Sequence, residues 1–279
     1  MPIYNARPFL QRSIPSVLMQ EEVLELICIN DGSTDGSYEF MQSWAHRESR
    51  IRVFQHPGRE RKRAAASRNL GLKNVKGDYI AFLDADDEFL EDRFSRISSQ
   101  LLSGKEIDLS LSNVVLKFEN EKEFITSISS ESPMDVARQI FLNPAKNPIP
   151  NISGLVLSRN MMNQLGCFDE SLLQKEDKDY MLRAFLLATP SKVYLENQAT
   201  AIYHQYDGST STLREEHYED ASRWYLKWLK ASNFPFSIWI RLKFIWQFMV
   251  VKNRADSWKL GRKLLFYPFL YIRCLVKYF

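Results

Sequence analysis

The stretch YIAFLDADD, from Tyr79 to Asp87, is an apolar run that passes directly into a cluster of acids. Five apolar residues in succession predict a strand buried on both faces, because a strand with one wet face would alternate apolar and polar side chains. The acids Asp84 and Asp86 therefore follow the carboxyl end of a buried strand. Ligands of α/β sheets bind beyond the carboxyl ends of the strands. This stretch predicts both an α/β fold and the sheet edge at which to expect a site.

Strand-like and helix-like segments alternate on both sides of this stretch. Short apolar runs predict further strands over residues 24–30, 51–56 and 108–117. Helical periodicity predicts helices over residues 6–20, 35–46, 63–74 and 89–102. Such alternation is typical of a mainly parallel, Rossmann-like sheet with helices on both faces. From residue 213 onward the pattern is helical, so we expect an α/β domain over residues 1–212 and a helical extension over residues 213–279.

Asp84 and Asp86 put two carboxylates into one turn. Because like charges repel, a folded chain keeps such a pair only in water or around a cation. Carboxylate oxygens suit Mg²⁺ or Mn²⁺, which also take phosphate oxygens and water as ligands. The alternative is a solvated turn that begins the following helix. Asp31, in NDGSTDGS over residues 30–37, follows another predicted strand. Its carboxylate suits a ribose or base, or it belongs to a turn capped by its own side chains.

Three other groups of residues are candidates for chemistry. Arg63 and Arg68 lie five residues apart on an Ala-rich helix, and guanidinium groups suit a diphosphate as well as they suit a solvated helix face. Glu176 and Asp177 open a helix, where an acid either acts as a general base or simply favours the helix dipole. His204 is a lone histidine, which is a metal ligand or a structural residue.

The order of these blocks along the chain resembles glycosyltransferase family 2. The resemblance rests on P-x-Y-N (2–5), NDGSTDGS (30–37), ASRNLGL (66–72), YIAFLDADD (79–87) and FDESLLQKED (168–177). It implies a GT-A fold for residues 1–212, a nucleotide-diphosphate sugar as donor, most often UDP-linked, and inversion at the anomeric carbon. It also implies an apolar strand directly before Pro2. Met1 alone stands there, so we expect this strand to be truncated in the given sequence.

The resemblance assigns the donor site by position. The residues that match the family's nucleotide contacts are Pro2, Tyr4, Asn5, Asp31, Arg63, Arg68, Asp84 and Ala85. Asp86, with Asp84 beside it, matches the ligand of Mn²⁺ or Mg²⁺. Tyr206 stands where many relatives carry a histidine near the metal or diphosphate. His204, two residues earlier, is the remaining candidate metal ligand on this segment.

The resemblance also assigns the sugar and acceptor side. Ser153 and Gly154 match a loop of small residues beneath the donor sugar. Asp177 matches the general base, which takes a proton from the attacking hydroxyl, and Glu176 lies beside it near the acceptor. No covalent intermediate is implied, so no nucleophilic Ser or Cys is expected.

Residues 237–279 are basic and aromatic. They contain nine Lys or Arg residues and one acid, Asp256, so the rest of the chain is net acidic although the whole chain is +3. Their apolar runs are interrupted by basic residues and fall short of the ~20 residues of a membrane span. This pattern suits helices lying on an anionic leaflet. The alternative is a helical pair packed on the domain or on a dimer partner. Because the rest of the chain is acidic, we expect no nucleic-acid binding.

Cys28, Cys167 and Cys274 lie far apart in apolar stretches and predict buried free thiols of a reducing compartment. We therefore expect a cytoplasmic protein, peripheral on the cytoplasmic face of a membrane. The expected activity is inverting transfer of a sugar to a hydroxyl of a glycan or lipid-linked acceptor during bacterial surface polysaccharide synthesis. Two alternatives stay open, namely transfer to a polyprenyl phosphate and a nucleotide-sugar-binding pseudoenzyme that scaffolds a synthase.

Overall fold

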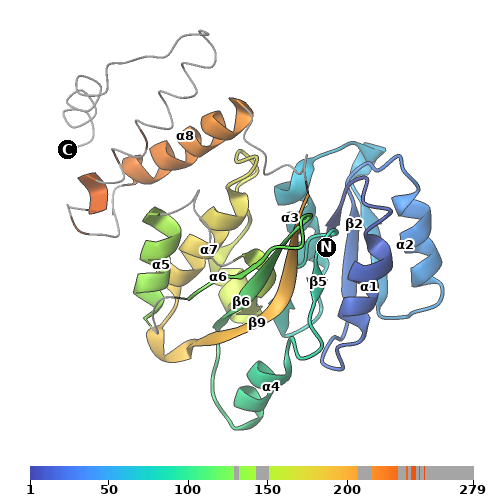
Figure 1. The fold of residues 1–279 in the computed structure, drawn as a ribbon, viewed down its shortest axis with the longest axis horizontal. Coiled ribbons are helices and arrows are strands. Elements are labelled where there is room, and N and C mark those ends of the chain that lie inside the picture. The colour runs from blue at the N-terminus through green and yellow to red at the C-terminus, as the bar shows by residue number, and fades with distance from the viewer. Residues whose placement is uncertain are drawn as a thin grey trace.

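The computed structural model describes residues 1–128, 132–142, 151–206, 215–231, 237, 240–242, 245 and 248. These residues form two sheets covered by helices (Figure 1). The N-terminal sheet has the order β1-β2-β3, and both of its strand pairs are parallel. Its elements in chain order are β1 (Pro2–Ile3), α1 (Leu10–Leu18), β2 (Leu26–Asn30), α2 (Ser37–Ala45), β3 (Ile51–Gln55), a 3₁₀ turn (Pro57–Arg59) and α3 (Arg63–Asn74).

The second sheet has the order β4-β8-β6-β9-β5, with β7 paired to β6. Its strands are β4 (Tyr79–Ala81), β5 (Glu88–Phe89), β6 (Leu109–Phe118), β7 (Glu123–Ile125), β8 (Leu155–Ser158) and β9 (Val193–Gln205). Among the described strands of this second sheet, only β6 and β9 pair in parallel, and the other pairs are antiparallel. The expected parallel arrangement therefore holds for the N-terminal sheet, whereas the second sheet is mixed. A sequence pattern of alternating helices and strands predicts the layers of the fold, but it does not predict whether two neighbouring strands run parallel or antiparallel.

The helix predicted over residues 89–102 is wrong in its first part. Phe89 belongs to β5, where its N–H donates to the Ser16 hydroxyl, and the N–H of Leu90 donates to the carbonyl of Thr200. The helix α4 (Ser95–Leu102) begins only after Phe94, whose ring lies edge-on to that of Phe89 at 5.5 Å. Pairing with β9 and burial of the two rings override the local helical periodicity.

The remaining helices cover the second sheet. They are α5 (Pro133–Leu142), α6 (Arg159–Leu165), α7 (Glu176–Leu187) and α8 (Glu215–Lys230), with 3₁₀ turns at Ile152–Gly154 and Pro190–Lys192. Figure 1 shows α5, α7 and α8 at the opposite end of the molecule from α1 and α2. Trp224 and Leu229 of α8 are buried in one apolar cluster with Phe141 of α5 and Tyr180 of α7. The first helix of the predicted extension thus packs into the main apolar core.

The other predictions for the extension fall largely outside the described residues. Residues 249–279, and most of residues 232–248, belong to that undescribed part. No helix among the described residues is long and apolar enough to cross a membrane. Cys28 and Cys167 are both free thiols; the predicted burial is confirmed for Cys28 and wrong for Cys167, which is exposed, and Cys274 lies outside the described residues. Cys167 follows Gly166, which ends α6 with a positive φ of 74°, so the chain has left the packed helix before the thiol.

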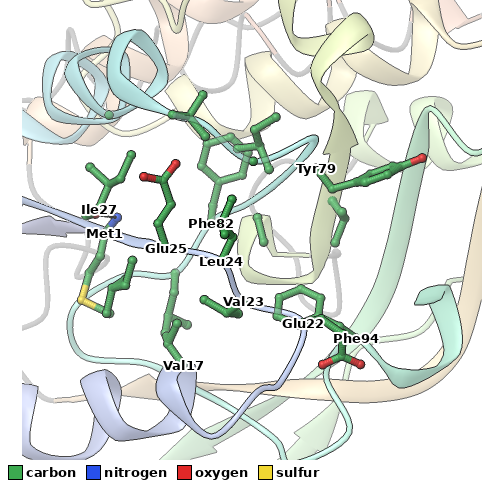
Figure 2. A pocket seen from close by; sticks show the side chains of 18 of the residues that line it. Met1, Val17, Glu22, Val23, Leu24, Glu25, Ile27, Tyr79, Phe82 and Phe94 are labelled. Atoms are coloured by element: carbon green, nitrogen blue, oxygen red, sulfur yellow. Dashed lines mark hydrogen bonds between the residues drawn. The ribbon is translucent and has the colours of Figure 1, made fainter. Parts of the chain in front are cut away.

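A cavity of about 410 Å³ lies between β2 and β4, where the two sheets do not join (Figure 2). Its wall is mainly apolar and includes Val17, Ile27, Ile80, Phe82 and Val156. Met1 also lines it, and the Met1 ammonium donates to the carbonyl of Ile27 at 2.9 Å. The acids of the predicted donor site do not line this cavity. The truncation of the first strand, which the resemblance implies, stays a prediction.

Candidate functional site

Arg68, on α3, joins the two acidic segments that the sequence analysis singled out. Its Nη2 donates to Asp84 Oδ1 at 2.6 Å, and its Nη1 donates to Glu176 Oε1 at 2.8 Å. Burial opposes its charge, but the carboxylates of Asp84, Glu176 and Asp177 together raise the pKa of Arg68. The turn after β4 and the start of α7, distant in sequence, therefore meet at one guanidinium. In this arrangement Arg68 is bound to protein carboxylates on two of its nitrogens.

Glu176 and Asp177 have different surroundings although they are adjacent. The Glu176 side chain is 8% exposed, and burial raises its pKa to about 7, with Asp177 adding to the rise and Arg68 opposing it. The Asp177 side chain is 21% exposed. Its Oδ1 accepts the N–H of Lys178 at 2.7 Å, and its Oδ2 lies 3.9 Å from the Lys178 ammonium. Of the two acids, Asp177 is the one that solvent or an acceptor can reach.

Asp86 carries a partly buried carboxylate. Burial raises its pKa to about 6, the charge of Asp84 adds to this, and Arg12 acts in the opposite direction. Its side chain has no ion-pair contact with any of the described residues. A second acid at 84 and the absence of a neutralising contact make Asp86 a place where a cation lowers the electrostatic free energy. The structure thus brings Asp84 and Asp86 together as the sequence predicts.

Asp87 ties the acidic turn to β9 and to the 3₁₀ turn Ile152–Gly154, a role that the sequence analysis did not predict. Its Oδ1 accepts the backbone N–H of His204 at 3.0 Å, and its Oδ2 accepts the hydroxyl of Ser153 at 3.3 Å. The residue is fully buried. Burial, followed by the charges of Asp86 and Asp84, raises the pKa of Asp87 well above its ordinary value. Ser153 is thereby a buried support of the acidic turn.

Arg12 and Tyr206 flank Asp86, and only Tyr206 gave a signal in the sequence, as a departure from the family pattern. Arg12 Nη2 donates to the backbone carbonyl of Asp86 and to the Tyr206 hydroxyl. The Tyr206 ring stacks on Phe9 of the segment before α1, with centroids 5.0 Å apart. A guanidinium therefore lies beside the acidic turn where the resemblance implied an imidazole.

His204 contacts the Glu88 carboxylate and is not part of a cluster of metal-ligating side chains among the described residues. Its Nε2 lies 2.7 Å from Glu88 Oε1, and its ring stacks parallel to Tyr206 with centroids 6.1 Å apart. Burial lowers the pKa of His204, although the bond to Glu88 acts against this. Within the described part of the chain, no three His, Cys, Asp or Glu side chains are grouped to hold a metal.

Asp31 and Tyr4, predicted base and ribose contacts, meet the basic loop before α3. Asp31 is buried, and its carboxylate accepts the backbone N–H groups of Lys62 and Arg63 at 2.6 to 3.1 Å. The Tyr4 ring is 40% exposed, and the Arg61 guanidinium lies 3.8 Å from its centroid. A flat cationic group thus covers an aromatic face at the edge of the N-terminal sheet.

The remaining predicted residues act through the backbone or through packing. Asn5 has a φ of 48°, and its Oδ1 accepts the N–H of Thr34, which joins P-x-Y-N to NDGSTDGS. Pro2 pairs with β2, Ala85 is buried, and the exposed Arg63 opens α3. A Cβ on Gly154 would lie 2.4 Å from the carbonyl oxygen of Ser112 on β6. Close packing on β6 thus explains the small residue at 154.

Comparison with known proteins decides the family. The sequence model of glycosyl transferase family 2 matches residues 1–155, more than half of the chain. The chain belongs to glycosyltransferase family 2. It is 41% identical over 97 residues to an uncharacterized glycosyltransferase of Haemophilus influenzae, covering 34% of this chain and 38% of that protein. It is 36% identical over 96 residues to the putative teichuronic acid biosynthesis glycosyltransferase TuaG of Bacillus subtilis, covering 34% of this chain and 37% of TuaG. The aligned parts thus span well under half of these relatives.

Solved structures of glycosyltransferases have the same fold. Staphylococcus aureus TarS 1–349 in complex with UDP-GlcNAc matches with a TM-score of 0.65 at 18% identity, over 99% of this chain and 78% of that one. The mannosyltransferase PcManGT of Pyrobaculum calidifontis, in complex with GDP-Man and Mn²⁺, matches with a TM-score of 0.60 at 13% identity. The match covers 99% of this chain and 71% of PcManGT. The α/β architecture is therefore that of the GT-A enzymes, as expected from the sequence.

Proposed function

We propose that the chain transfers a sugar from a nucleotide-diphosphate donor, a UDP-sugar, to an acceptor hydroxyl with inversion at the anomeric carbon. The observation that carries this proposal is the Arg68 bridge. It joins the acidic turn of Asp84 and Asp86, which suits a cation and a diphosphate, to the start of α7. There Asp177 keeps a partly exposed carboxylate. The proposed donor site and the segment that carries the proposed base are thus joined through one side chain.

The residues fit a metal ion shared with the donor. Asp86 supplies a partly buried carboxylate with a raised pKa, and Asp84 a second one, whose Oδ1 is bound to Arg68. Because Mg²⁺ and Mn²⁺ complete their coordination with phosphate oxygens and water, two carboxylates suffice for such a site. When bound, the metal neutralises charge that develops on the leaving diphosphate. Arg12 adds a further positive charge beside the same turn.

Asp177 is the residue proposed to take the proton. A general base must reach the acceptor hydroxyl, and Asp177 is more exposed than Glu176. Glu176, buried against Arg68, keeps the first turn of α7 in place beside the acidic turn. The acceptor oxygen then attacks the anomeric carbon from the face opposite the diphosphate, the bond to the diphosphate breaks, and the proton passes to Asp177. No covalent intermediate with the protein is formed.

The proposed setting is the synthesis of a bacterial surface polysaccharide at the cytoplasmic face of the membrane, with a glycan or lipid-linked acceptor. Its support is the similarity to TuaG, whose name assigns it to teichuronic acid biosynthesis, and the similarity in fold to a UDP-GlcNAc complex. The basic, aromatic residues 237–279 are proposed to hold the chain on an anionic leaflet.

Turnover tests this proposal. We expect the wild-type protein to release UDP from one or more of a panel of UDP-sugars, starting with UDP-GlcNAc. We expect Asp177→Asn to keep its fold and to lose at least ~10²-fold in kcat. The matched control is Asp169→Asn, another partly exposed acid close by in sequence but outside the Arg68 bridge. An Asp177→Asn variant that keeps most of its activity with a polyprenyl phosphate acceptor would favour the alternative reaction, because an acceptor that is already an anion needs no base. Nucleotide binding without any turnover would favour the pseudoenzyme.

A further inference from the structure

Asp220, on α8, lies against the segment that leads into the proposed base. It is fully buried, and its carboxylate accepts three consecutive backbone N–H groups. The N–H of Leu173 donates to Oδ1 at 2.8 Å, and those of Gln174 and Lys175 donate to Oδ2 at 2.8 and 3.1 Å. Hydrogen bonds to an ionised carboxylate are stronger than neutral ones. This one side chain therefore fixes the backbone of three successive residues.

The fixed segment is the direct start of α7. Lys175 is the N-cap residue of α7, and its own side chain makes no capping hydrogen bond. Helix starts leave backbone N–H groups without intrahelical partners, and a negative charge there is favourable. Asp220 supplies both an acceptor and that charge from another helix. Glu176 and Asp177 follow Lys175 without an intervening residue, so their direction is set by the segment that Asp220 holds.

A second set of contacts from α8 reaches one turn further along α7. The Lys227 ammonium donates to Asp179 Oδ2 at 2.9 Å, and Trp228 Nε1 donates to Asp179 Oδ1 at 3.1 Å. These contacts fix α8 on α7 beyond the proposed base. Together with Asp220 they make α8 the support of the first turn of α7, although α8 lies in the part that the sequence analysis assigned to a separate extension.

We propose that Asp220 is a positioning residue for the glycosyl transfer. By holding residues 173–175 it keeps Glu176 on Arg68 and the carboxylate of Asp177 at the acceptor side of the site. A displacement of about 1 Å in a reacting group costs up to ~10²-fold in rate. Loss of this support therefore lowers kcat while donor binding, which depends on residues of the N-terminal sheet and the acidic turn, is unchanged. The inference rests on the proposed role of Asp177 as the base.

The test compares Asp220→Asn with Leu229→Ala in the full chain. Asparagine has nearly the same shape but presents an amide NH₂ where the carboxylate accepted N–H groups. Leu229 is buried on the same helix and packs in the apolar core, so its truncation controls for a general loss of stability. Amide hydrogen exchange of peptides from residues 172–182 is measured first. We expect at least ~10-fold faster exchange there in Asp220→Asn than in Leu229→Ala.

Calorimetric titration of UDP and release of UDP from UDP-GlcNAc complete the test. We expect an unchanged Kd for UDP and a ~10- to 100-fold lower kcat in Asp220→Asn, with a kcat close to wild type in Leu229→Ala. Unchanged exchange in residues 173–178, or equal kcat in the two variants, overturns the positioning role. If Asp177→Asn keeps the wild-type rate, the proposed base is wrong, and the exchange measurement still decides whether Asp220 holds the start of α7.

Discussion

Replacing Arg68 with methionine removes the cation that two carboxylates share. The Arg68 side chain is 4% exposed, and its partner Glu176 is 8% exposed. One oxygen of Glu176, Oε2, is already buried without a hydrogen-bond partner. Arg68→Met removes the cation bound to the other oxygen, Oε1, so a buried charge stays uncompensated. Breaking a buried ion pair in this way costs about 3–5 kcal/mol of unfolding free energy. The lost ion pair with Asp84 adds less to this cost, because the Asp84 side chain is 28% exposed.

The unfolding free energy lost in Arg68→Met is larger at high pH than at low pH. Burial raises the pKa of Glu176 from an ordinary value of 4.5 to about 7, and removing the opposite charge of Arg68 raises it further. A carboxyl group whose pKa is higher in the folded than in the unfolded state stabilises the fold fully below the unfolded pKa. That contribution is lost as pH rises through the folded pKa. At pH 5 Glu176 is protonated in the folded variant, so we expect a loss of about 1–2 kcal/mol there and about 3–5 kcal/mol at pH 8.

Urea unfolding at pH 5 and pH 8, followed by circular dichroism, measures both values. Arg138→Met is the matched control, because Arg138 pairs at 2.8 Å with Asp135 while both side chains are more than 40% exposed. We expect a loss of at most about 1 kcal/mol for this variant at either pH. A loss below about 1 kcal/mol for Arg68→Met at pH 8, or an equal loss at both pH values, would refute the reasoning about a buried bridge.

Three further predictions follow from local geometry. Gly71→Ala on α3 should raise the unfolding free energy by about 1 kcal/mol, because alanine favours the helix and a methyl group there meets only one side-chain atom, at 3.9 Å. Gly154→Ala should lower the unfolding free energy, because its Cβ would lie 2.4 Å from a carbonyl oxygen of β6. In thermal melts, a lower melting temperature for Gly71→Ala would contradict the first prediction, and an unchanged or higher one for Gly154→Ala would contradict the second. Iodoacetamide should label Cys167 in the native protein and spare Cys28, whose pKa burial raises to about 11, and peptide mass spectrometry reads out both sites. Tyr206→Phe should cost about 1 kcal/mol or less in urea unfolding, since it loses one hydroxyl contact and keeps its stacking. A larger loss in Tyr206→Ala is expected, and equal losses would show that the ring contact contributes nothing.

The sequence predicted the parts of the fold that depend on local pattern. The apolar runs that lead into Asn30 and Asp84 contain β2 and β4, as continuous apolar residues indicate. Burial on both faces is wrong for Tyr79, which is exposed on β4, and β4 ends at Ala81, before the apolar run does. The helix over residues 63–74 was predicted with its bounds. The start of the predicted helix over residues 89–102 is wrong because Phe89 pairs with Ala201 of β9, more than a hundred positions away, which no local window contains.

The sequence indicated which acids share the turn after β4 but not the contacts that those residues make. Asp84 and Asp86 lie together in one turn, as the spacing indicated. Arg68 is buried, so the alternative of a solvated residue is wrong, and it binds a carboxylate 108 positions away that no local pattern indicated; its predicted contact to phosphate stays a prediction. Arg12 and Asp220 gave no signal, because each acts on another segment through backbone groups. Backbone carbonyls and N–H groups leave no trace in residue types, so such supports appear only once the chain is folded.

Calorimetric titration of UDP into the protein, first with Mn²⁺ and then with EDTA, tests the central claim most directly. We predict binding that requires Mn²⁺ and that disappears in Asp86→Ala, while Glu88→Ala, a change two residues further along, retains it. The contrary result is UDP binding that is equal in Mn²⁺ and EDTA and unaffected by Asp86→Ala, or no binding under either condition. Either outcome would contradict a donor site in which Asp86 and a divalent cation hold the diphosphate.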